Sequence, residues 1–187
     1  MPKMNRRHFL KFPLAAAALT LNVRADGTDR APEGFSVKSG SDRYQEELQI
    51  MGGSFCCKVS AKDTGGDLCI YDTVRKTKGG PALHRHFIQD EWFYVVRGEF
   101  AVEVGGVRTK LGPGDSAFGP RKIPHAFANV GESEGQLLIL FQPAGSMEDY
   151  FRQMAKYGSG LPTSGDPVQK ALWESHGMEV VGPPLRF

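Results

Sequence analysis

Two histidines and a glutamate lie close together near the middle of the chain, in a pattern that suits metal binding. His84 and His86 are two residues apart, and Glu91 follows five residues after His86. Alternate residues of a β-strand point to the same face, so the two imidazoles can converge on one point. Glu91 opens an apolar strand, where a buried carboxylate needs a partner because an unpaired buried charge is costly. A metal ion shared with the two histidines would be that partner.

A third histidine, His125, begins another short strand and is the candidate fourth ligand. It follows Pro124, and Phe127 and Asn129 share its side of the strand. Three of the five histidines thus fall in two glycine-punctuated segments with strand pattern. A single histidine is usually a surface or satisfied core residue, so the combined pattern carries the prediction of a metal site.

Three imidazoles and one carboxylate predict one divalent metal ion per chain. The donor set suits Fe(II), Mn(II), Ni(II), Co(II) or Zn(II), and the pattern leaves all five open. It lacks the thiolates of a typical closed structural zinc site. Four protein ligands on an octahedral ion would leave two positions for a substrate and for dioxygen or water. The metal could then act as a Lewis acid or support oxygen chemistry.

Five further residues are candidates for the surroundings of this metal. Three phenylalanines share the inward parity of their strands and could line an apolar mouth, although aromatic core packing is an equal alternative. Two polar residues could select substrate groups, although surface placement is the expectation for both. These residues are Phe93, Phe127 and Phe141, and Arg75 and Gln89.

The ligand segments resemble the two motifs of the cupin superfamily. The first motif reads G-x5-H-x-H-x3,4-E-x6-G, and the stretch from His84 to Gly98 matches it, with Gly79 one residue closer than the pattern expects. The second reads G-x5-P-x-G-x2-H-x3-N, and the stretch from Gly114 to Asn129 matches it. Lys122 stands where the family prefers glycine, a departure that touches a turn and not a ligand.

The resemblance covers residues 79–129 and, with flanking strands, about 44–142. It implies an all-β fold, the cupin double-stranded β-helix or jelly-roll barrel. The strand pattern itself indicates a β-sandwich or barrel, because short apolar strands recur between glycine turns. The expected strands include 44–51, 55–62, 67–75, 92–96, 99–104, 107–111 and 136–142.

The pattern changes to a helical period after the barrel. A first helix is expected to begin at a Ser146 cap and to end at Gly158. A second is expected to begin at Asp166-Pro167 and to end before Gly177, with His176 as a cap or surface residue. The chain therefore divides into a barrel, 44–145, and a C-terminal helical extension, 146–187.

The N-terminus resembles a twin-arginine export signal. Residues 6–11 match R-R-x-F-L-K, and the apolar stretch 12–23 is too short to span a bilayer. Cleavage is expected after Ala25, which makes residues 1–25 a signal peptide and 26–43 a linker or mobile arm. We expect an exported protein, periplasmic or extracellular, with no stable membrane anchor after cleavage.

The net charge gives no indication of a nucleic-acid partner, and the cysteine count does not decide whether a disulfide forms. Loss of residues 1–25 takes the formal charge from +2 to −3, so the basicity belongs to the signal and nothing points to nucleic acid. Cys56, Cys57 and Cys69 are an odd number for an exported chain. Buried thiols are expected, and a disulfide between Cys69 and one of the other two is the alternative.

The strand at 136–142 is apolar on both faces, so each face must be covered by another part of the protein or by a partner. The core would cover one face, and the N-terminal strands or a second subunit would cover the other. Because cupins commonly dimerise in this way, the resemblance implies a homodimer.

Three classes of function fit a metal-binding cupin with a small-molecule ligand. The first is a metal-dependent dioxygenase-like oxidoreductase, similar to quercetinases, acting on an aromatic or flavonol-like molecule. The second is a metal-dependent isomerase or decarboxylase of a sugar or small organic acid. The third is a non-catalytic binding protein that keeps its metal. The fold hosts all three, so the site must decide among them.

Overall fold

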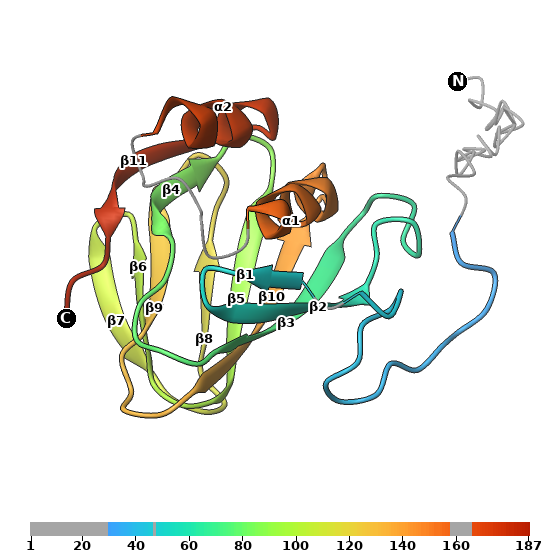
Figure 1. Ribbon diagram of the computed structural model, residues 1–187, viewed down its shortest axis with the longest axis horizontal. Coiled ribbons are helices and arrows are strands. Elements are labelled where there is room, and N and C mark those ends of the chain that lie inside the picture. The colour runs from blue at the N-terminus through green and yellow to red at the C-terminus, as the bar shows by residue number, and fades with distance from the viewer. Residues whose placement is uncertain (1–29, 47, 158–165) are drawn as a thin grey trace, which may run out of the picture.

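Two antiparallel sheets face each other in the computed structural model, which describes residues 30–46, 48–157 and 166–187 (Figure 1). The strands are β1 Leu48–Ile50, β2 Gly53–Val59, β3 Cys69–Arg75, β4 Ala82–His86, β5 Asp90–Arg97, β6 Phe100–Val104, β7 Val107–Leu111, β8 Ser116–Gly119, β9 His125–Asn129, β10 Gly135–Gln142 and β11 Met178–Pro184. The larger sheet has the order β1-β2-β3-β10-β5-β8, and the smaller β11-β4-β9-β6-β7. This is the jelly-roll architecture that the sequence predicts.

The core lies between the sheets and follows the alternation of the strands. On β10, Leu137, Ile139 and Phe141 point inward and are almost fully buried, as are Phe93 and Val95 on the neighbouring β5. Residues between them on each strand point outward and are partly exposed. One buried and one exposed face per strand is what an antiparallel sheet needs when it packs on a single side.

Strand pairing brings distant segments of the sequence to one place. On the smaller sheet, β4 pairs with β9, and His84 is the direct partner of His125. On the larger sheet, β5 lies between β10 and β8, where Glu91 is opposite Phe141 and Gly119. The candidate ligands therefore come from both sheets and can meet only inside the barrel.

Helices α1, Met147–Lys156, and α2, Pro167–Ser175, lie over one end of the barrel (Figure 1). The predicted cap of α2 is confirmed, because the Asp166 side chain accepts a hydrogen bond of 2.8 Å from the backbone N–H of Val168. The prediction for α1 was wrong in its cap, since the Ser146 side chain makes no capping hydrogen bond. His176 is the C-cap of α2, but it is buried and not a surface residue.

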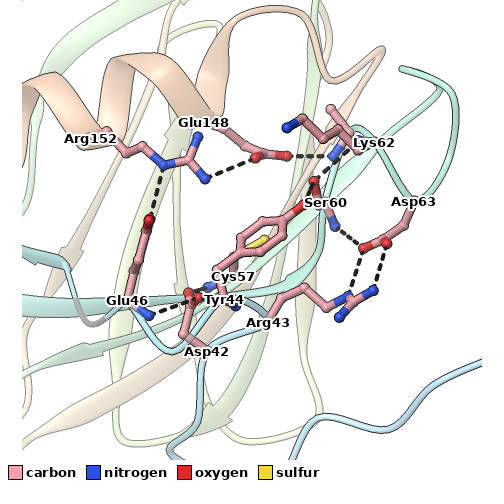
Figure 2. A network of polar contacts seen from close by, with 11 residues as sticks. Asp42, Arg43, Tyr44, Glu46, Cys57, Ser60, Lys62, Asp63, Glu148 and Arg152 are labelled. Carbon is pink, nitrogen blue, oxygen red and sulfur yellow. Dashed lines mark hydrogen bonds and ion pairs between the residues drawn. The ribbon is translucent and has the colours of Figure 1, made fainter. Parts of the chain in front are cut away.

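Polar contacts fasten α1 to the start of the barrel (Figure 2). Glu148 on α1 accepts hydrogen bonds from the backbone N–H of Ala61 and from Arg152, and Arg152 also pairs with Glu46 at 3.0 Å. Apolar contacts support the same position, because Met147, Tyr150, Phe151 and Met154 form the buried face of the helix. The helix is thus held from both its polar and its apolar side.

The described part of the expected arm is also attached to the barrel. Asp42 is buried and accepts hydrogen bonds from the backbone N–H groups of Cys57 and Tyr44, the latter at 2.7 Å (Figure 2). Arg43 forms two hydrogen bonds to Asp63, of 3.2 and 3.1 Å. Residues 42 and 43 therefore belong to the packed structure of the hairpin between β2 and β3.

One strand was not expected from the sequence. After α2 the chain returns to the barrel as β11, whose Met178 and Val180 pair with His86 and His84 of β4. The C-terminal extension therefore contributes to the sheet that carries two candidate ligands. Its Gly182-Pro183-Pro184 end, which reads as a strand breaker, lies at the point where the register shifts.

The cysteines are buried and form no disulfide within the described residues. Burial, together with nearby carboxylates, raises the pKa of Cys57 to about 12, so its thiol is protonated and unreactive at neutral pH.

No helix of the described residues is long and apolar enough to cross a membrane. The expected signal peptide, 1–25, lies outside the described residues.

Candidate metal centre

The three imidazoles converge on one carboxylate oxygen in the barrel interior. The Oε2 atom of Glu91 lies 2.8 Å from Nε2 of His125, 3.2 Å from Nε2 of His86 and 3.8 Å from Nε2 of His84. One ligand atom of each of the four residues lies within 4.8 Å of the others, and all four side chains are buried. Ligands held about 2.0–2.2 Å from one ion would have comparable separations.

Hydrogen bonds on the far side of two rings orient them toward this point. Nδ1 of His84 lies 2.8 Å from the carbonyl oxygen of Ala82, and Nδ1 of His125 lies 2.9 Å from that of Ile123. A carbonyl only accepts, so each Nδ1 carries the proton and each Nε2 presents a lone pair. This backbone support is common behind metal-ligating histidines.

The donor set fits a divalent metal because lone pairs otherwise face one another. Neutral Nε2 atoms and an ionised carboxylate are all acceptors, so their convergence is unfavourable unless a cation or protons lie between them. The four buried side chains, whose ligand atoms lie within 4.8 Å of one another, can share one metal ion. We conclude that His84, His86, Glu91 and His125 could hold a metal.

The pKa shifts of His84 and Glu91 agree with this donor set. Burial, together with the neighbouring imidazoles, lowers the pKa of His84 to about 4, so this ring is a neutral ligand at physiological pH. Burial alone would raise the pKa of Glu91, but hydrogen bonds to the three histidines outweigh it and hold the pKa well below its usual value. The carboxylate is therefore ionised and available to a cation. Burial would lower the pKa of His125, but the contact with the Glu91 carboxylate outweighs it and raises that pKa, so a proton lies where a metal ion would bind.

The turn before β9 explains the departure from the second motif. Lys122 has a φ of 68°, the left-handed conformation that favours glycine, and its backbone N–H donates to the carbonyl of His86 at 2.6 Å. The family's glycine preference therefore corresponds to a real backbone requirement here. Lys122 meets it at some conformational cost, and the turn still ties the β9 ligand to the β4 ligand.

A cavity of about 50 Å³ adjoins the ligands. Of the five candidates for the surroundings of the metal, Phe127, Phe141 and Arg75 line this cavity. Phe93 does not and instead packs in the core beside Phe127, with ring centroids 5.6 Å apart. Arg75 and Gln89 are both buried, so surface placement was wrong for each.

Sequence reasoning missed the contribution of the helices to the cavity. Tyr150 and Met154 of α1 and Trp173 of α2 line it, and the Trp173 ring lies 4.9 Å from that of His84. The helical period of the two segments identified their apolar faces but not the surface they cover. The cavity is therefore bounded by both sheets and by both helices.

The ligand assignment predicts that metal content depends on His86 but that the barrel does not. His86→Ala removes one donor at the centre of the cluster, and we expect metal content after purification to fall at least about tenfold. A control, His176→Ala, removes a buried histidine outside the cluster and should leave metal content unchanged. Elemental analysis with circular dichroism checks both, and equal metal content in His86→Ala and parent would contradict the assignment.

Comparison with known proteins supports the cupin resemblance. Residues 73–141 match the family model described as the Cupin domain, Cupin_2. An uncharacterized protein of Methanocaldococcus jannaschii is 28% identical over 67 residues, which is 36% of this chain and 54% of the relative, so the chain spans about half of that relative's length.

Two solved structures share the fold. A predicted oxalate decarboxylase from Thermotoga maritima has a TM-score of 0.52 at 17% identity, over 59% of this chain and 99% of its own. An oxalate decarboxylase from Bacillus subtilis has a TM-score of 0.51 at 21% identity, over 65% of this chain and 33% of its own. The family model, the paired sheets and the gathered ligands agree in making this barrel similar to the cupin superfamily.

Proposed function

We propose that the protein is a metal-dependent enzyme that acts on a small molecule inside the barrel. The single observation that carries this proposal is the convergence of three histidine Nε2 atoms on the Oε2 atom of Glu91 beside a cavity. A structural metal site needs no adjoining cavity, whereas a site that processes a ligand does. The metal would supply Lewis acidity or redox chemistry at the positions the protein leaves open.

The chain's own residues would bind the metal, orient the substrate and keep water out. The backbone carbonyls of Ala82 and Ile123 fix two ligand rings. Phe127 and Phe141 on the strands and Tyr150 on α1 form an apolar wall around the ligands. An apolar wall strengthens electrostatic interactions within the site, because it removes competing water.

The first candidate activity is that of a dioxygenase-like oxidoreductase. Its support is the aromatic lining, since a dry apolar cavity suits dioxygen and an aromatic substrate. A cavity of about 50 Å³ is too small for a flavonol as it stands. A substrate of that size would require α1 and α2 to move away from the sheets.

Cavity size favours a second candidate, an isomerase or decarboxylase of a small organic acid. At about 10–15 Å³ for each water, the cavity holds about four waters. That space suits a molecule of a few carbon atoms without any movement of the helices. Dioxygen consumption separates the two candidates.

We expect turnover that requires the metal and that depends on His86. Protein loaded in turn with iron, manganese, nickel, cobalt and zinc is supplied with catechol, a flavonol and acids of two to six carbons. Dioxygen uptake would identify the oxidoreductase, and carbon dioxide release or isotope exchange without uptake would identify the second class. Any such activity should fall to background in His86→Ala. Tight binding with no turnover for any metal would contradict an enzymatic function.

We propose that the outer face of the larger sheet forms a homodimer interface. Trp92 and Tyr94 stack on this face with ring centroids 5.7 Å apart, and Leu138 and Leu140 lie beside them on β10. Phe118, the partner of Trp92 on β8, is 55% exposed. A contiguous apolar face of this kind commonly marks an interaction site.

The dimer proposal predicts a mass of twice 20.5 kDa for the chain by light scattering. Introducing charge with Trp92→Arg and Phe118→Asp should give a monomer, because burying unpaired charges at the interface is unfavourable. Val107→Asp, on an exposed residue of the smaller sheet, serves as the control and should remain dimeric. A monomeric parent at micromolar concentration would contradict the proposal.

We propose export by the twin-arginine pathway, on the support of the R-R-x-F-L-K match alone. Changing Arg6 and Arg7 together to lysine should reduce the exported fraction at least about tenfold, while Lys3→Gln should leave it unchanged. Fractionation of cells that express the tagged full chain measures this. Export of the double variant at the parental level would contradict the assignment.

A further inference from the structure

A buried arginine lines the cavity and is accommodated by a glycine on one neighbouring strand. Arg75 ends β3, with Gly53 of β2 and Gly135 of β10 as its direct partners. A Cβ atom on Gly53 would lie 3.0 Å from Cδ and 3.1 Å from Nη1 of Arg75. The missing side chain of Gly53 therefore provides the space that the long arginine side chain occupies.

The guanidinium has very little hydrogen bonding for a group so deeply buried. Arg75 is only 4% exposed, and its Nη1 donates one long hydrogen bond of 3.4 Å to the carbonyl of Ile50. Within the described residues, its Nε has no hydrogen-bond partner and no carboxylate lies within ion-pair distance. Buried charges are normally paired, so this arrangement is costly for folding alone.

Desolvation is the cause of this cost. Burial lowers the pKa of Arg75, because its charged form loses hydration that no protein group replaces. A bound carboxylate would replace that hydration with charge-assisted hydrogen bonds, for which the planar guanidinium is well suited.

A second unpaired donor lines the same cavity. The indole N–H of Trp173 is buried and has no acceptor within the described residues. Most of the other lining side chains are apolar, among them Ile50, Phe55, Ile139 and Met154. Two unpaired donors in an apolar wall call for a ligand that brings its own oxygen acceptors.

The arginine and the metal ligands stand at different levels of the barrel. Arg75 is opposite Gly135 at the start of β10, and Glu91 is opposite Phe141, six residues further along. That spacing corresponds to about 20 Å along the strand direction at about 3.3 Å for each residue. Arg75 and Glu91 nevertheless line one cavity, which therefore connects the two levels.

We propose that Arg75 binds the carboxylate of a small, otherwise apolar organic acid whose other end faces the metal ligands. This inference rests on the proposed function, of which it names the substrate class. The acid would enter with its carboxylate toward Arg75 and its carbon chain against Phe127 and Ile139. Arg75 is then the residue that selects acids over neutral molecules of the same shape.

The test measures binding of matched acids and alcohols to the chelator-treated full chain. Butyrate is compared with 1-butanol and benzoate with benzyl alcohol, by calorimetry and thermal shift at constant ionic strength. We expect each acid to bind at least about tenfold more tightly than its alcohol, since hydrogen bonds to a charged group are the strong ones. Because no metal is present, failure of the metal-site proposal does not affect this outcome.

Two uncharged variants, Arg75→Met and Arg75→Gln, should lose the preference for the acids at least about tenfold. Their thermal stability without ligand should equal or exceed that of the parent, because an unpaired buried charge has been removed. A merely structural arginine would give the reverse, a lower stability with unchanged acid binding. Arg97→Met removes an exposed arginine paired with Glu134 and serves as the matched control.

Four results would overturn the proposal. The first is unchanged acid binding in a folded uncharged variant, and the second is equal affinity of the parent for an acid and its alcohol. The third is failure of both uncharged variants to fold, which would make Arg75 a structural requirement. Inorganic phosphate that binds as tightly as both acids would also overturn it, since the site would then recognise any anion.

Discussion

The convergence of three imidazoles on one buried carboxylate is the constraint on which the rest of the structure depends. Glu91 belongs to the larger sheet and the three histidines to the smaller one, so the cluster exists only while the two sheets face each other. An ionised carboxylate at 3% exposure is costly unless it is paired. Packing of the two sheets and burial of the ligand cluster are therefore coupled. The two together are favourable only when the four ligands share a cation.

The helices and the C-terminal strand extend this coupling to the end of the chain. Strand β11 supports β4 along the pair His84 and His86, and α2 places Trp173 against His84. Helix α1 covers the neighbouring part of the cavity and is tied to the β2–β3 hairpin through Glu148. A segment that the sequence assigns to a separate extension is thus part of the wall of the site, and it determines how much room a ligand has.

The ligand spacing could be predicted from the sequence because it follows from local geometry. Strand periodicity places His84 and His86 on one face, and a short turn brings Glu91 into the next strand of the chain, which lies on the facing sheet. The surroundings of Arg75 could not be predicted in the same way. The sequence favoured surface placement because arginine is usually exposed, whereas Arg75 is only 4% exposed in the structure.

Contacts between distant segments account for the other differences. The position of Trp173 depends on how α2 packs, and β11 forms because β4 offers a free edge, which is a property of the assembled sheet. The Lys122 turn shows the opposite case. A glycine preference in the motif pointed to a left-handed residue, and the backbone adopts that conformation even with lysine in place.

Two of the unpaired buried donors among the described residues belong to side chains that line the cavity, whereas a polar network elsewhere in the fold is satisfied. The polar network around Asp42 and Glu148 is well satisfied by its own hydrogen bonds, as structural networks generally are (Figure 2). The cavity instead contains lone pairs of histidine directed at a carboxylate, together with N–H donors of Arg75 and Trp173 that lack acceptors. The first set calls for a cation and the second for an anion. A metal ion and a carboxylic acid bound in one cavity would satisfy both sets, so the costs of burying these groups are best explained as costs of function.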